Sequence, residues 1–221
     1  MPTTPYPARL DGTLDEPISR WRWIVKPLLV IPHLIALVAL WLAMIVLTAV
    51  AGASILFTGR YPRSIFDFNV GVLRWSWRVA FYTFGALGTD RYPPFSLQPD
   101  PTFPADLSVD YPERLSRGLV LVKWWLLALP QLLVVLLFAG GPAWVVARPF
   151  AGGPIGVMTL AAGVVLLFTQ EYPRQVFDVV MGMDRWCLRV VTYVALMRDE
   201  YPPFRLDRGG DDPASLWGRT A

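Results

Sequence analysis

Charged residues, cysteine and histidine are all scarce in this chain of 221 residues. Only 17% of the residues are charged, whereas soluble domains hold about a quarter, and the mean hydropathy is +0.43. Residues 27–57 and 124–146 contain no charged side chain at all. Because about 20 apolar residues cross the hydrocarbon layer of a bilayer, the sequence predicts an integral membrane protein rather than a soluble one.

The single cysteine, Cys187, and the single histidine, His33, exclude most site chemistry. One cysteine cannot form an internal disulfide, and the two residues together are too few for a zinc, haem or copper site. A Ser-His-Asp triad would need His33, which follows Pro32 in an apolar run. The simpler interpretation is that the His33 imidazole forms a hydrogen bond with a neighbouring residue near the lipid headgroups. The chain also lacks a Walker A loop, a dinucleotide fingerprint and an HExxH motif. We therefore expect no enzyme activity, no cofactor and no metal.

The basic character of the chain predicts lipid as its partner. Its pI is about 9.2, but Lys and Arg are scattered around the apolar stretches instead of forming one soluble basic module. Anionic membrane lipids fit this pattern better than nucleic acid. Residues 1–17 are polar and rich in proline, without the apolar core of a secretory signal, so we expect a cytoplasmic (inner) membrane location.

The sequence contains an internal repeat. The string FTGRYPRSIFD at 57–67 returns as FTQEYPRQVFD at 168–178, and DRYPPFSL at 90–97 returns as DEYPPFRL at 199–206. Upstream, Glu16, Ser19, Arg20 and Lys26 match residues 113, 116, 117 and 123. This order of matches predicts a polar arm at 1–15, a first membrane repeat at 16–97, a linker at 98–112, a second repeat at 113–206 and a disordered tail at 207–221.

The paired YPRxxFD and DxYPPF motifs resemble a bacterial membrane-protein family that is known only as domain of unknown function 4389. The resemblance covers nearly the whole chain and both copies of the motifs. It implies a multi-span bacterial membrane protein, and it supplies no catalytic residues.

The predicted fold is an all-α membrane bundle. Each repeat begins with an apolar span that carries Pro32 or Pro130 near its start, and a second helix follows at 62–87 or 173–197. With four spans, twelve Lys and Arg lie on one side and four on the other, which places both termini in the cytoplasm. Glycine and proline at 140–154 indicate a bent or re-entrant piece of the third span. Two full helices there would instead give five spans and inverted repeats.

A polar stripe runs along each second helix, at offsets of 0, 4, 7 and 11 residues that fall on one helical face. Its members are Asp67, Gly71, Arg74 and Arg78, repeated as Asp178, Gly182, Arg185 and Arg189. We hypothesise that the two helices pack with Gly71 against Gly182 and with each Asp facing an Arg of the other copy.

The stripe has three competing interpretations: a buried ion-pair network, interfacial helices whose arginines reach phosphates, or an anion or headgroup pathway. A local pair between Arg63 and Asp67, or between Arg174 and Asp178, would compete with the contact between copies.

These patterns predict a non-enzymatic membrane protein that binds lipid or serves as an accessory or scaffold subunit of a membrane complex. The alternative is a small transporter or channel with its Arg- and Asp-lined site between the repeats. The partners expected are anionic lipids and a membrane-protein partner or a second copy of the chain. Aromatic residues near the helix ends are expected to anchor the protein at the membrane interface, namely Tyr61, Trp75, Tyr92, Tyr172, Trp186 and Tyr201.

Overall fold

A computed structural model describes residues 6–139 and 153–210 of the chain. The structure is mostly helical and also contains one two-stranded sheet among the described residues. In chain order the elements are β1 (Ala8–Gly12), α1 (Arg22–Leu29), α2 (Ile31–Thr58), α3 (Arg63–Tyr82), β2 (Ala105–Val109), α4 (Arg117–Val122), the π-helical segment η1 (Lys123–Leu127), α5 (Leu129–Ala139), α6 (Pro154–Thr169) and α7 (Arg174–Val194).

The helix pair of the first half follows the sequence pattern closely. The apolar run divides at Val30 into α1 and α2, because Pro32 lies in the first turn of α2 and cannot donate a backbone hydrogen bond. Gly59 ends α2 in the left-handed conformation, with φ at 73°. The next helix, α3, begins after Pro62 and ends at Tyr82, five residues before the predicted end at 87.

The second half has the same order of helices but a divided apolar region. Segments α4, η1 and α5 follow one another from residue 117 to residue 139, and α6 covers residues 154–169. The predicted bent or re-entrant piece at 140–154 lies outside the described residues except for its last two positions. Within the described part, α2 is the one helix that is both long enough and apolar enough to cross a membrane.

The strands correct two sequence predictions. We expected a polar arm at 1–15 and a linker at 98–112, but β1 and β2 form an antiparallel ribbon in which Leu10 lies opposite Leu107. Both leucines are buried, and so are Ala8 and Ala105. Apolar and polar residues alternate over these five-residue segments, which is the period of a half-buried strand. The chain is therefore mostly helical rather than all-α.

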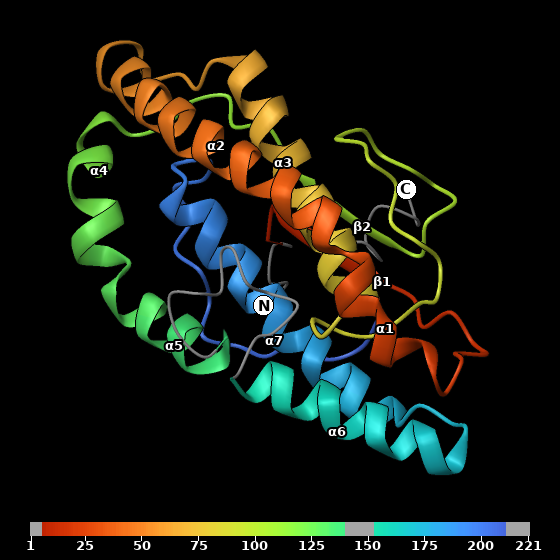
Figure 1. Cartoon of the computed structure of the whole chain (residues 1–221). Helices are drawn as coiled ribbons and strands as arrows, with labels where there is room; N and C mark the ends of the chain where they lie inside the picture. Colours follow the sequence, from red (N-terminus) through yellow and green to blue (C-terminus); the bar gives the residue numbers. More distant parts are fainter. Residues whose placement is uncertain (1–5, 140–152, 211–221) are drawn as a thin grey trace, which may run out of the picture.

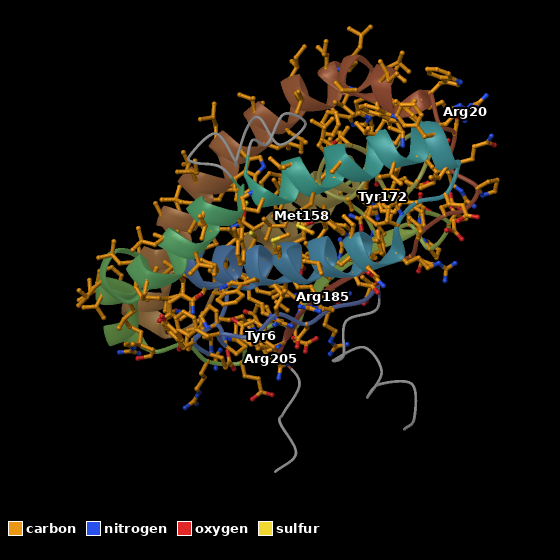
Figure 2. All side chains as sticks on the ribbon, turned by 90° about the horizontal axis from the view of Figure 1, so that it is seen from below. Tyr6, Arg20, Met158, Tyr172, Arg185 and Arg205 are labelled. Atoms are coloured by element: carbon orange, nitrogen blue, oxygen red, sulfur yellow. The ribbon has the colours of Figure 1, made fainter. Side chains whose placement is uncertain are left out.

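Helices α3 and α7 occupy the middle of the molecule (Figure 1). On one side α2 packs against α3 and α6 packs against α7, while on the other side β2 contacts α3 and β1 contacts α7. In Figure 2, Tyr6, Arg185 and Arg205 lie on the side of α7 that faces away from α2 and α6. The apolar helices and the polar ribbon thus cover opposite sides of the two central helices.

The chain beyond the second repeat is also packed, at least as far as residue 210. The Gly12 N–H donates to the Gly210 carbonyl at 3.0 Å, and the Asp207 carboxylate pairs with Arg189. The prediction of a disordered tail from residue 207 is therefore wrong for residues 207–210, because this segment supplies backbone oxygens to a buried arginine described below.

Candidate functional site

Arg74 and Arg185 bind backbone oxygens of the ribbon and of the segments that follow their own helices. Arg74 on α3 donates to the carbonyls of Leu107 at 2.9 Å and Leu97 at 3.0 Å. Arg185 on α7 donates to the Leu10 carbonyl at 2.9 Å. Leu107 belongs to β2 and Leu10 to β1, so each helix is tied to the strand that precedes the other helix pair.

The tail completes the coordination of Arg185. Its guanidinium also donates to the carbonyl oxygens of Asp207, Gly209 and Gly210. Arginine has five N–H donors in a fixed plane, so one side chain can satisfy several carbonyls that no strand partner reaches. The guanidinium is fully buried. Its contacts are those of a structural brace for loop backbone.

The second pair of stripe arginines is buried as well. Arg78 donates to the Gln98 carbonyl at 2.9 Å and lies 3.8 Å from the Asp106 carboxylate. Arg189 pairs with Asp207 at 2.7 Å and lies over the Tyr6 ring at 5.5 Å. Burial, reinforced by the charge of Glu200, raises the pKa of the Tyr6 phenol, which therefore stays neutral beside the cation.

The hypothesis that the two stripes face each other is wrong. Asp67 pairs with Arg63 on its own helix at 3.1 Å, as the competing local prediction had it. Arg174 pairs with Glu16 instead of Asp178. Over residues 6–139 and 153–210, neither stripe aspartate pairs with an arginine of the other central helix.

The stripe glycines lie against loops and not against each other. A Cβ added at Gly71 would lie 2.8 Å from the Cβ of Leu97, and one added at Gly182 would lie 2.9 Å from the Cγ of Leu206. The absence of a side chain at each glycine therefore lets the segment directly after the YPPF motif of the same repeat pack closely against the helix. Gly71, Arg74 and Arg78 face residues 96–98, so the ribbon and the loops lie beside α3 where a second helix was expected.

Two buried lysines form a contact that the sequence analysis did not predict. The Nζ of Lys26 lies 2.9 Å from the Asp90 carboxylate and 4.8 Å from the centre of the Tyr82 ring. In the second half, Lys123 makes the same contacts with Asp199 at 2.6 Å and Tyr193 at 4.9 Å. All six residues are repeated in the sequence, and this repetition was the available signal. The pairs tie the start of each apolar region to the loop after its second helix.

The predicted interface anchors divide into two groups. Tyr61, Trp75 and Tyr172 are buried in the protein, which rules them out as contacts to lipid headgroups. Tyr61 donates across the halves to the Ala195 carbonyl, and Tyr172 donates to the Ala86 carbonyl. Tyr92 and Tyr201 are exposed, as an interface position requires.

The two tryptophans of the anchor prediction point inward. The Trp75 indole N–H donates to Nδ1 of His33 at 3.0 Å, and that of the half-buried Trp186 donates to Oε1 of Gln131 at 2.7 Å. His33 itself is buried and stacks on Phe95, with ring centres 3.8 Å apart. A hydrogen bond to a neighbour was expected of His33, and the structure supplies it inside the protein.

Apolar side chains cover the outer surface of α1, α2, η1, α5 and α6. We call this surface the apolar face. On α2 the exposed members include Ile35, Leu42 and Val46, each at least 60% accessible. The most apolar 18-residue stretch of α2 is only 17% buried, whereas the core helix of a soluble protein would be mostly covered. The exposed large side chains of the face are Ile24, Val25, Leu28, Leu29, Ile31, Ile35, Val38, Leu42, Ile45, Val46, Val50, Leu56, Phe57, Leu126, Leu129, Leu133, Leu136, Leu137, Val157, Leu160, Val164, Val165 and Phe168.

Two surface pockets flank this face at corresponding positions of the two halves. The first has a volume of about 430 Å³ and joins the end of α2 to the start of α4, and we call it the basic pocket. The second has a volume of about 800 Å³ and joins the end of α6 to the segment before α1, and we call it the opposite pocket. The basic pocket is lined by Thr58, Gly59, Arg60, Arg114, Leu115 and Arg117.

No metal site is formed by the described residues, where no three His, Cys, Asp or Glu side chains come together. What the fold defines is a mostly helical protein with one helix able to cross a membrane, an apolar face and internally braced arginines. Residues 20–96 match the family of the domain of unknown function DUF4389. This match supports the family resemblance over the first repeat. Neither a curated protein sequence nor a solved structure matches the chain.

Proposed function

We propose that this chain is a non-enzymatic membrane protein that holds lipid or a partner subunit against its apolar face. The observation that carries the proposal is the exposure of α2, a helix of 28 residues without one charged side chain. At 1.5 Å per residue it is about 42 Å long, which exceeds the hydrocarbon thickness of about 30 Å. An exposed apolar surface of this extent marks a contact with lipid or with another protein.

The proposal extends to the second half of the chain. Residues 117–139 and α6 carry exposed leucine, valine and phenylalanine on their outer sides, as α2 does. Together with α2 they supply the apolar segments of a multi-pass protein of the inner membrane. If α2 crosses the bilayer, residues 114–117 lie on the side opposite to the N-terminal arm, because they share a pocket with the end of α2. Helices α3 and α7 would then face protein rather than lipid, because their arginines are buried by the ribbon.

The arginine stripe gives no support to a transporter or channel. Arg74, Arg78, Arg185 and Arg189 bind oxygen atoms of this chain, so an anion passing between the halves would have to displace those contacts. The contacts of the stripe arginines are those of an internal brace. The exposed apolar face is better explained by a scaffold or lipid-binding role.

Fractionation of cells that express the full chain tests the proposal. We expect the protein in the membrane pellet, resistant to a carbonate wash at high pH and released by detergent. Recovery as a monodisperse protein in the detergent-free soluble fraction would contradict the proposal. Release of the protein by the carbonate wash would indicate a peripheral membrane protein. That result would be consistent with lipid contact but would contradict helices that span the membrane.

A further inference from the structure

The basic pocket concentrates unpaired positive charge at the edge of the apolar face. Three of its six lining residues are arginines, and within the described part of the chain no carboxylate pairs with Arg60, Arg114 or Arg117. The Arg117 Nε lies 3.6 Å from where a Cβ on Gly59 would be, and the Leu115 N–H donates to the Gly59 carbonyl at 2.9 Å. The pocket is thus a defined contact between two chain segments, and its cations lack internal counter-charges.

The opposite pocket provides an internal comparison. Following the sequence repeat, Arg60 corresponds to Glu171 and Arg114 to Pro17. The opposite pocket is lined by Glu16, Glu171 and only one arginine, Arg174, which pairs with Glu16 at 2.8 Å. The two halves therefore keep the pocket and differ in its charge. If the fold alone required these positive charges, both pockets would carry them. We therefore attribute the arginines of the basic pocket to a ligand.

The position of the pocket specifies the kind of ligand. It lies at the polar end of α2, directly after Phe57, whose side chain is 76% exposed on the apolar face. Leu121 on α4 is also exposed, so apolar surface continues from the pocket on both segments. Guanidinium groups bind phosphate oxygens in forked pairs, and apolar helix surface beside them accommodates acyl chains.

We propose that the basic pocket binds the phosphate of an anionic phospholipid, with Arg60, Arg114 and Arg117 around the headgroup and the acyl chains along α2 and α4. This inference rests on the proposed membrane location and names the lipid class and the site. The opposite pocket does not bind the same headgroup, because Glu16 and Glu171 repel phosphate.

Native mass spectrometry of the full chain in a neutral detergent tests the site. Phosphatidylglycerol is titrated into wild-type protein, into R60Q/R117Q and into R20Q/R174Q. The last variant also removes two positive charges, Arg20 at the position that corresponds to Arg117 and Arg174 in the opposite pocket, so non-specific attraction falls equally in both variants. We expect R60Q/R117Q to bind phosphatidylglycerol about thirtyfold more weakly, since each arginine near a membrane surface contributes a factor of about five to six. R20Q/R174Q should stay within about threefold of wild type, since neither arginine faces the site and only screened attraction is lost.

The controls separate the outcomes. Circular dichroism and thermal unfolding confirm that both variants fold, and phosphatidylcholine and soluble glycerol 1-phosphate serve as alternative ligands. Equal weakening in the two variants, or no weakening in R60Q/R117Q, would overturn the site. Full competition by glycerol 1-phosphate would assign the pocket to a soluble phosphate rather than to a lipid. Failure of the proposed function would show in the fractionation instead, as protein recovered outside the membrane.

Discussion

Arg185 shows how backbone oxygens accommodate a buried cation in this protein. An isolated charge in an apolar interior is costly, and the cost is offset only when hydrogen bonds satisfy its donors. Arg185 meets carbonyl oxygens of Leu10, Asp207, Gly209 and Gly210. The Asp207 and Gly209 carbonyls lie in a loop, where few backbone donors are available, and the Gly210 carbonyl also accepts from the Gly12 N–H.

Replacing Arg185 with lysine is therefore expected to destabilise the protein. Lysine keeps the charge but offers three donors from a single atom, which cannot reach all the carbonyls around the guanidinium, so at least one of them loses a donor. A buried polar group without a partner costs about 1–3 kcal/mol. For a chain of this length that corresponds to a fall in the unfolding midpoint of about 2–4 °C per kcal/mol, measurable in detergent solution.

Arg63→Lys is the matched control for that substitution. Arg63 lies on the exposed surface, where it pairs with Asp67 four residues away and lies over the Tyr111 ring, and lysine can keep both contacts, so its replacement should change the midpoint by less than about 2 °C. Equal midpoints for Arg185→Lys and wild type would show that the carbonyl contacts of Arg185 contribute nothing to stability.

At the scale of the elements, the burial of the helices is the reverse of what their hydropathy would give in a soluble protein. The apolar α2 has most of its surface exposed, while the Arg-bearing α3 and α7 are buried. This arrangement is expected when lipid rather than water covers the outer layer, because apolar side chains then need no protein partner.

A lysine at position 46 tests which solvent covers α2. Val46 is 62% exposed near the middle of the helix, so Val46→Lys should add about 2.5–3.5 kcal/mol to membrane insertion and reduce the amount of protein in the membrane fraction. In water the same substitution would be neutral or would improve solubility.

Thr13→Lys supplies the control, because Thr13 is exposed beside the ribbon and its side chain makes no hydrogen bond in the described structure. Its membrane level should equal that of wild type. Equal levels of Val46→Lys and Thr13→Lys would place α2 outside the hydrocarbon.

The helices could be predicted from the sequence, whereas the two strands and the contacts of the arginines could not. The periodic segments after Pro62 and Pro173 gave α3 and α7 to within a few residues at their starts. The ribbon was missed because its strands have five residues each, lie 97 positions apart and are flanked by Pro99, Pro101 and Pro104, which suggest a linker. The partners of the stripe arginines were missed for the same reason, since backbone oxygens of a ribbon leave no residue-type signal.

For the molecule as a whole, the ribbon joins the two halves crosswise. Tyr61 and Tyr172 reach into each other's halves, and so do Arg74 and Arg185. Matching residues of the sequence repeat make matching contacts in each case. A change in one half should therefore propagate to the other.

Leu10→Asp is expected to loosen the second half although Leu10 lies at the start of the chain. Leu10 is 2% exposed, and a carboxylate there would be buried opposite Leu107. The ribbon would separate to hydrate the charge, and Arg185 would lose an acceptor. Amide hydrogen exchange in α7 should then become at least about tenfold faster than in wild type, since that ratio corresponds to only about 1.4 kcal/mol of local stability.

The neighbouring variant Arg9→Gln provides the comparison, because Arg9 forms a partly exposed pair with Asp110 on the ribbon's outer side. Exchange in α7 should stay at the wild-type rate in this variant. Faster exchange confined to residues near the mutated strand, with α7 unchanged, would show that the halves are energetically separate.

The pairing of β1 with β2 also sets an order of events during protein synthesis. Leu10 leaves the ribosome first but meets Leu107 only after some hundred further residues have been added, which takes about 5–20 s at ordinary elongation rates. Arg185, the cation that braces the β1 backbone, arrives later still. The N-terminal segment therefore stays unpaired until β2 and α7 have been synthesised, and the first part of the protein to be made is among the last to complete its contacts.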